Sequence, residues 1–275
     1  FAACPQLKTV HIDMPSSTNV TYSMFQYSRS LISVSGDFNT PNLTTAYSMF
    51  YGCSSLVNAP DVNLSSCTHA KEMFRDCKKL NGHVRINAPN LNNAERMYYN
   101  CGSIDRVTIE DLSSPSASNF NSLFSACTSL RVVDVVNPNI PCSYSPYMFN
   151  SCSDLQSVGS INFSGNSNLT SSFHSCINLK KLGRLHTPTV TTFNSMFASC
   201  YELTKPTVSD ITAQGTGNVS CDSMFYYCSK LKEAPNFDYS RVSNFDQMFY
   251  LCSNMSGNIE TLDFSNIARS TTTNT

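Results

Sequence analysis

The most reactive side chains of this 275-residue chain belong to thirteen cysteines and five histidines. A cysteine beside a histidine can supply an activated nucleophile, and the tract His174-Ser175-Cys176 brings these residue types close together. However, Cys176 shares its position in a repeated motif with nine other cysteines, which favours a structural role. We therefore expect an exposed histidine beside a buried cysteine, and we predict that the chain is not an enzyme.

The sequence also offers no pattern for a metal ion or a cofactor. It contains no Cys-x-x-Cys pair and its ten glycines form no phosphate-binding loop. The serines, although numerous, define no Ser-His-Asp arrangement. The histidines occupy unrelated positions, namely His11, His69, His83, His174 and His186. We expect neither a cofactor nor a bound metal.

The repeated motif is Met-Phe-x-x-Cys-x-x-Leu, as in the tract that runs from Met196 to Leu203. It occurs eleven times, with steps of 24 to 28 residues between successive motif aromatics. Such a period is typical of solenoids built from stacked coils. The motif aromatics are Phe1, Phe25, Phe50, Phe74, Tyr98, Phe124, Phe149, Phe173, Phe197, Phe225 and Phe249. The motif cysteines are Cys4, Cys53, Cys77, Cys101, Cys127, Cys152, Cys176, Cys200, Cys228 and Cys252, and Ser28 takes this place in the second copy.

Two hydrophobic periods alternate within each repeat. Apolar residues recur at i, i+3, i+4 and i+7 across the motif, for example in residues 193–200, which predicts one short helix. After the motif leucine, shorter alternating stretches such as residues 133–135 predict a strand. We therefore expect an α/β repeat solenoid similar to leucine-rich repeats. Each of its eleven coils would hold one short parallel strand and one short helix, and residues 1–275 would form a single domain.

Stacking would place the motif cysteines about 5 Å apart, within the range that a disulfide permits. Because identical side chains on stacked coils point the same way, we favour a buried ladder of free thiols over bridges. Cys67, Cys142 and Cys221 lie outside the motif phase. Cys67 and Cys142 share a position but lie three coils apart, too far to form a bridge.

The motif and its spacing resemble the BspA-type leucine-rich repeats, most clearly in YGCSSLVNAP (residues 51–60) and CSKLKEAP (residues 228–235). The resemblance covers the whole chain. It implies a surface protein of a bacterium or a microbial eukaryote, or a phage tail protein. It also implies adhesion, partner binding or a structural spacer as the function, rather than catalysis.

Two sets of residues are candidate interaction or modification sites. The first is a group of tyrosines just after the motif aromatic, which would form an outward stripe for a glycan or protein partner, or else pack between coils. These tyrosines are Tyr27, Tyr51, Tyr99, Tyr226, Tyr227 and Tyr250. The second set comprises seven Asn-x-Ser/Thr sequons, at about the number that chance would give in so Asn-rich a chain. They start at Asn19, Asn42, Asn63, Asn162, Asn168, Asn218 and Asn254.

Composition narrows the classes of partner. Charged residues make up 13% of the chain, against a usual ~25%, and the net charge is −1, which argues against nucleic-acid and electrostatic membrane binding. No apolar run approaches the ~20 residues of a membrane span. Serine, threonine and asparagine, about a third of the residues, suit an extracellular fibre or a virion appendage.

We predict a non-enzymatic extracellular or cell-surface repeat protein that acts as an adhesin or as a fibre- or filament-forming element. The alternatives are a phage tail-fibre or receptor-binding segment on a virion tail and, less favoured by composition, an intracellular scaffold. The first repeat begins at core residues and the last segment matches the internal ones. We therefore expect an excerpt of a longer array that abuts another coil at both ends, as a homo-oligomer or a head-to-tail filament.

Overall fold

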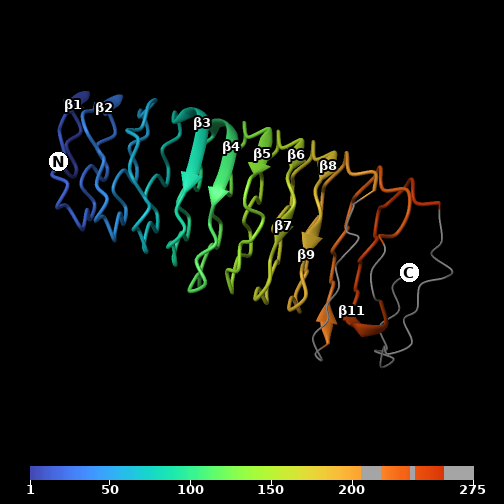
Figure 1. Ribbon diagram of the computed structural model, residues 1–275. Helices are drawn as coiled ribbons and strands as arrows, with labels where there is room; N and C mark the ends of the chain where they lie inside the picture. The colour runs from blue at the N-terminus through green and yellow to red at the C-terminus, as the bar shows by residue number, and fades with distance from the viewer. Residues whose placement is uncertain (206–217, 236–238, 257–275) are drawn as a thin grey trace.

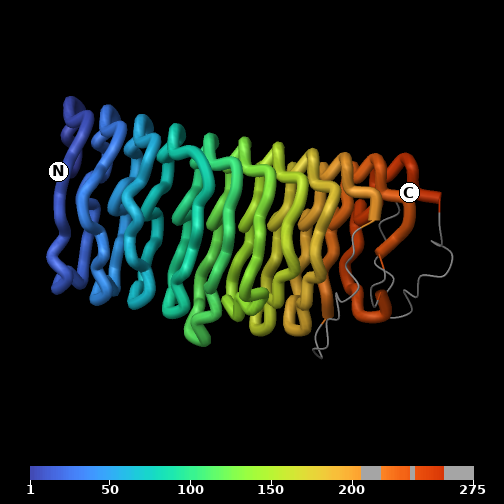
Figure 2. Tube along the Cα trace, turned by 45° about the horizontal axis from the view of Figure 1, so that its top comes forward, coloured from blue at the N-terminus to red at the C-terminus, as the bar shows by residue number. Residues whose placement is uncertain are grey.

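The computed structural model describes residues 1–205, 218–235 and 239–256, and its coils follow one another in chain order along one axis (Figures 1 and 2). Short strands recur along successive coils. They are β1 (Thr9–His11), β2 (Ser33–Ser35), β3 (Asn81–Asn87), β4 (Ser103–Asp111), β5 (Val132–Val135), β6 (Ser157–Val158), β7 (Ile161–Asn162), β8 (Lys181–Leu182), β9 (Leu185–His186), β10 (Val219–Ser220) and β11 (Val242–Asn244). Strands β10 and β11 lie at the other end of the coils from β3 and β4.

Every strand pairing in the described part of the chain is parallel and joins neighbouring coils. The largest sheet has the order β3-β4-β5-β6-β8, and smaller sheets pair β1 with β2, β7 with β9 and β10 with β11. Val107 of β4, for example, pairs with Val133 of β5. The expectation of a repeat solenoid with short parallel strands is confirmed, but not every repeat has a strand, since residues 50–73 form only isolated bridges.

The prediction of one short helix in each coil is wrong. The one helix in the described residues is a short 3₁₀ turn at Tyr239–Arg241. The motif instead forms successive tight turns, as in the eighth repeat, where the N–H of His174 donates to Ser171 and that of Cys176 to Phe173. The φ angles of Ser171 and Ser175 are +53° and +59°, in the left-handed region that a right-handed helix excludes. The same two positions, directly before the motif Met and the motif Cys, have positive φ throughout the array.

These left-handed residues let the motif bond to the next coil. Alternate main-chain N–H groups point out of the turn toward the following coil. Those of Ser171, Phe173 and Ser175 donate to main-chain carbonyls of that coil, at 2.9, 2.8 and 2.8 Å. A continuous α-helix would use each of these donors internally. Because turns that close between residues i and i+3 bury the same positions as one face of a helix, the hydrophobic period alone did not separate the two structures.

The motif aromatics form one continuous column through the solenoid. Ring centroids of successive copies lie 5.2 to 5.7 Å apart with nearly parallel planes, from Phe1 to Phe249. Most of these rings are fully buried, as Phe173 and Phe197 are. Tyr98 stands in the column where the other copies carry Phe. Burial of this continuous apolar layer is the main force that holds coil to coil.

The motif cysteines form the buried ladder that we expected, and all thirteen cysteines are free thiols. Each thiol from the third repeat onward donates to the carbonyl of the preceding motif aromatic, as Cys176 does to Phe149 at 3.1 Å. Ser28 makes the same bond to Phe1 at 2.7 Å. The motif position is therefore occupied by a small side chain that donates a hydrogen bond. Burial also raises the pKa of these thiols, to about 12 for Cys127.

Replacement of a column ring should destabilise the solenoid strongly. Phe197 is fully buried and stacks on Phe173 and Phe225, both at 5.4 Å. We expect Phe197→Ala to lower the free energy of unfolding by ~3–5 kcal/mol, because the cavity lies between coils that cannot collapse onto it. Urea denaturation measures the loss, and a value below ~1 kcal/mol would place Phe197 outside the core.

The hydrogen bonds of the thiol ladder predict that the donor at the motif Cys position contributes to stability, beyond the volume that the side chain fills. We expect Cys176→Ser to be more stable than Cys176→Ala by about 1 kcal/mol, because serine keeps a donor for the carbonyl of Phe149 and alanine leaves that bond unmade. Chemical denaturation of both variants measures the difference. If the alanine variant equals or exceeds the serine variant in stability, the thiol acts only as a small apolar filler.

Candidate binding surface

The outward side of the motif segments carries most of the tyrosines in the protein. We call motif wall the exposed and half-buried residues within five positions of a motif aromatic, the column itself excluded. Eleven of the thirteen tyrosines belong to it, and the other two, Tyr98 and Tyr239, are buried. The wall tyrosines are Tyr22, Tyr27, Tyr47, Tyr51, Tyr99, Tyr144, Tyr147, Tyr201, Tyr226, Tyr227 and Tyr250. The six that the sequence singled out are therefore part of a larger set. The other five stand at several different offsets from the motif aromatic, so no single motif phase identifies them.

The structure gathers the wall tyrosines into clusters rather than one stripe. Toward the N-terminus, Tyr27 and Tyr51 lie 4.9 Å apart between ring centroids. Toward the C-terminus, Tyr226 lies 6.4 Å from Tyr227 and 5.5 Å from Tyr250. Tyr27, Tyr227 and Tyr250 are exposed, whereas Tyr51 and Tyr226 are half-buried. Serine, asparagine, histidine and alanine take the equivalent positions between the clusters, at Ser125, Asn150, His174 and Ala198.

The sixth predicted tyrosine, half-buried Tyr99, packs against an arginine. The guanidinium carbon of Arg75 lies 4.9 Å from the ring centroid of Tyr51 and 5.5 Å from that of Tyr99, so the cation sits between two rings from neighbouring coils. The adjacent Tyr27 phenol and then burial raise the pKa of Tyr51 to about 12. The Tyr51 hydroxyl therefore stays protonated at neutral pH and can donate a hydrogen bond.

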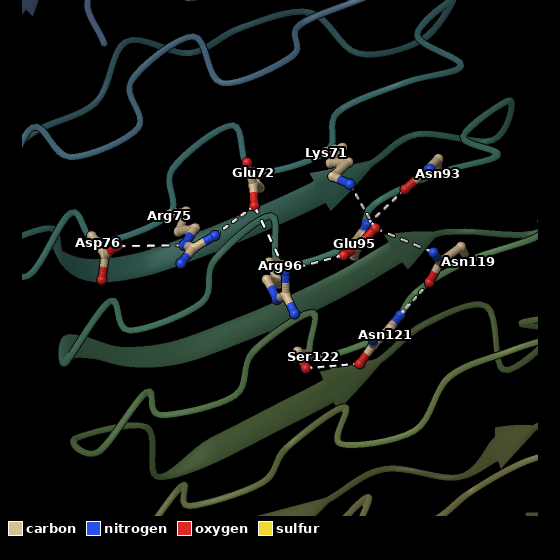
Figure 3. A network of polar contacts seen from close by, with 10 residues as sticks. All are labelled: Lys71, Glu72, Arg75, Asp76, Asn93, Glu95, Arg96, Asn119, Asn121 and Ser122. Atoms are coloured by element: carbon tan, nitrogen blue, oxygen red, sulfur yellow. Dashed lines mark hydrogen bonds and ion pairs between the residues drawn. The ribbon is translucent and has the colours of Figure 1, made fainter. Parts of the chain in front are cut away.

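A network of charged side chains holds this part of the wall in place (Figure 3). Arg75 pairs with Glu72 at 2.6 Å, and Lys71 pairs with Glu95 at 2.9 Å from the next coil. Arg96 lies 3.3 Å from Glu95. The Glu95 carboxylate raises the pKa of Lys71 by its hydrogen bond. These five residues, with Asp76 beside Arg75, carry three charges of each sign, so the network orders the wall without giving it a net charge.

A hollow of about 400 Å³ lies beside this network. Arg75, Arg96 and Tyr99 line one part of it, and Asn121, Ser122, Ser125, Tyr147 and Asn150 line the rest. Guanidinium, amide, hydroxyl and phenol groups thus face one space. This mixture of aromatic faces and hydrogen-bonding groups suits a polyhydroxylated or polar peptide ligand.

The His174 and Cys176 side chains are not brought together as a nucleophile and base. The imidazole Nδ1 of half-buried His174 lies 3.0 Å from the Ser175 hydroxyl, and burial lowers its pKa. Cys176 is fully buried, and burial raises its pKa well above the usual value. In the described ranges, no cluster of three or more His, Cys, Asp or Glu side chains could hold a metal ion. Nor does any helix among these residues have the length and apolarity to cross a membrane.

The seven sequon asparagines differ in their surroundings. Asn19, Asn42, Asn218 and Asn254 are exposed. Asn63, Asn162 and Asn168 are half-buried, and the amide nitrogens of Asn63 and Asn162 donate to asparagines of the preceding coil. The amide nitrogen of exposed Asn42 also donates to the preceding coil, at the Ser16 carbonyl, so exposure alone distinguishes the first four sites from these three.

The comparisons with known proteins point to a repeat family. The family model described as "Mycoplasma protein of unknown function, DUF285" matches residues 19–137 and 142–262. Among curated proteins none matches this sequence.

Solved structures with a similar architecture are leucine-rich-repeat proteins of bacteria. A leucine-rich cell surface protein of Faecalibacterium prausnitzii is 18% identical, with 94% of this chain and 82% of that chain covered and a TM-score of 0.38. A leucine-rich repeat protein of T. pallidum is 18% identical, with 70% and 77% covered and a TM-score of 0.39. One of Bacteroides ovatus is 14% identical, with 99% and 84% covered and a TM-score of 0.32. At such low scores these likenesses carry no argument about function.

The charged network should matter more to stability than its surface position suggests. Glu72 is only 8% exposed, and Arg75→Ala removes the nearest ion-pair partner of its carboxylate. We expect a loss of ~1–3 kcal/mol in the free energy of unfolding. The control is Arg106→Ala, which breaks an exposed pair with Asp134 of 2.6 Å and should cost ~1 kcal/mol or less. Equal losses in urea denaturation would show that the network is an ordinary surface arrangement.

Proposed function

This chain belongs to the DUF285 family, which agrees with the BspA-type resemblance of its repeats, and from that premise we propose that it is a non-enzymatic extracellular repeat protein. It acts as a surface adhesin whose motif wall binds a protein or glycan partner. The observation that carries this proposal is the concentration of eleven tyrosines on one wall of a regular solenoid.

Several properties of the wall support binding. Tyrosine contributes large contact area with few rotatable bonds, and it is enriched at the residues that dominate binding energy. The Arg75 sandwich and the ion pairs hold the side chains before a partner arrives, which reduces the entropy lost on association. The wall also repeats with the period of the coils, so a repetitive partner could meet it at several points at once.

A fibre- or filament-forming role uses the same architecture. Along the motif segments each coil directs N–H groups toward the following coil and carbonyls toward the preceding one, as the bonds of Phe50 to Met73 and of Phe74 to Met97 show. Such a direction suits head-to-tail association of copies of residues 1–275 as one solenoid of eleven repeats. A phage tail-fibre or receptor-binding segment on a virion tail would exploit the same wall.

The test compares binding by the native chain and by a tyrosine-depleted variant. Microspheres coated with the protein are applied to an array of defined oligosaccharides and to an array of purified extracellular-matrix proteins. We expect retention on at least one class of target. Combined Tyr27→Ser, Tyr227→Ser and Tyr250→Ser substitutions should lower it about tenfold or more, because these rings supply exposed contact area.

The matched control removes exposed apolar residues outside the wall. Ile32 and Val136 are 44% and 69% exposed, and Ile32→Ser with Val136→Ser should leave retention unchanged. The proposal fails if the two variants lose binding equally, or if neither array retains the native protein. Sedimentation of the native protein over a range of concentrations separately tests head-to-tail association, which would appear as a steady growth in mass.

A further inference from the structure

The ladder between coils is interrupted just before β3. The N–H of Asn81 donates to Val57 of the preceding coil at 3.3 Å. Beyond that bond, no main-chain hydrogen bond joins residues 58–64 to β3, although the structure describes both segments in full. On its other side, β3 is paired with β4 along its whole length. One edge of β3 is therefore a strand edge inside the stack.

A groove follows this free edge. A hollow of about 490 Å³ lies between residues 58–64 and the first half of β3. A second hollow, of about 400 Å³, continues toward the end of β3 and shares Asp61, Val62, Leu64 and Arg85 with the first. A Cβ atom built on Gly82 of β3 would meet no atom within 4 Å, so the space beside the strand is open there.

The floor of the groove holds the one tyrosine of the aromatic column. The two ring faces of Tyr98 are covered by Phe74 and Phe124, at 5.2 and 5.7 Å between centroids. Because Tyr98 nevertheless lines the larger hollow, only the ring edge with its hydroxyl can reach that space. The residue is 5% exposed, and its hydroxyl makes no hydrogen bond to any described residue. The hydroxyl oxygen is not one of the fully buried, unpaired polar atoms of the described residues, so it faces the hollow and can form a hydrogen bond with water or with a ligand group there.

The charges around the groove are not balanced. The Arg85 guanidinium pairs with Glu110, and the His83 imidazole lies 2.7 Å from the Thr108 hydroxyl. Asp61 is exposed and lines both hollows, and it has no ion pair within the described residues. Asp61, Arg85 and Glu110 together give the groove one net negative charge.

We propose that this groove binds an extended peptide segment of a partner protein that carries a lysine or arginine side chain. The peptide main chain would pair with the free edge of β3 as an added strand. The aliphatic part of the basic side chain would lie against Val62 and Leu80, and its charged head would reach Asp61. The Tyr98 hydroxyl would accept or donate a hydrogen bond at the end of this pocket. The groove lies beside β3, so this inference is independent of the motif wall.

The probe is a library of blocked hexapeptides in which valine and threonine alternate and one central position varies over all residue types. Six residues match β3, which has seven. We expect lysine and arginine at the centre to bind most tightly, with glutamate at least tenfold weaker. On binding, amides of β3 should become protected from hydrogen exchange. Methylation of alternate peptide nitrogens should abolish binding, because it removes the main-chain donors.

Three variants of the full chain separate the contributions. Tyr98→Phe restores the residue that other motif copies carry, so it should fold normally and lose about three- to tenfold in affinity. Asp61→Asn should lose about tenfold and should no longer discriminate lysine from glutamate. Tyr99→Phe, one position away on the motif wall, should leave the affinity unchanged.

Three results would overturn the proposal. The first is that no member of the library binds the native chain. The second is equal affinity of the native chain, Tyr98→Phe and Asp61→Asn for the lysine peptide. The third is undiminished binding of the N-methylated peptide, which would show that no strand pairing occurs. Loss of motif-wall binding with an intact groove response would instead count against the proposed function alone.

Discussion

The structure depends on how the main-chain N–H groups of each motif are divided between acceptors in their own coil and acceptors in the next coil. Half of these donors close turns within their own coil, and the others reach the carbonyls of the next coil. The arrangement requires a left-handed residue before the motif Met and another before the motif Cys, positions that serine occupies more often than any other residue. It also sets the coils at a spacing at which aromatic rings stack and thiols reach carbonyls, so the motif residues follow from the backbone ladder.

Departures from the motif are informative because the backbone constrains every copy alike. Ser28 replaces the cysteine and keeps its hydrogen bond, which identifies the donor as the feature that the position requires. Tyr98 replaces the phenylalanine and adds a hydroxyl that no described residue satisfies, at the coil where the strand ladder opens. The first change preserves the stack, whereas the second adds a polar group to an interior that the other copies keep apolar. Only the second places a polar group at the groove beside β3.

The sequence predicted the solenoid, because its motif repeats with the period of the coils. For the same reason it predicted that Phe197 and Cys176 are buried and that a strand lies near Val133. It missed the turn ladder, since tight turns and helices bury the same positions and nothing in serine at 171 or 175 identifies a positive φ. It also missed the place of Arg75 between the rings of Tyr51 and Tyr99, because this is a contact across three coils. The groove beside β3 arises from hydrogen bonds that are not made, which no local pattern reveals.

The left-handed turn ladder is best tested by solution NMR on the eighth repeat. Backbone chemical shifts and amide–Hα couplings should give positive φ at Ser171 and Ser175, and a coupling through the hydrogen bond should join the Phe173 N–H to the Met196 carbonyl. Helical shifts running without interruption from 169 to 176, with no coupling between Phe173 and Met196, would contradict the account.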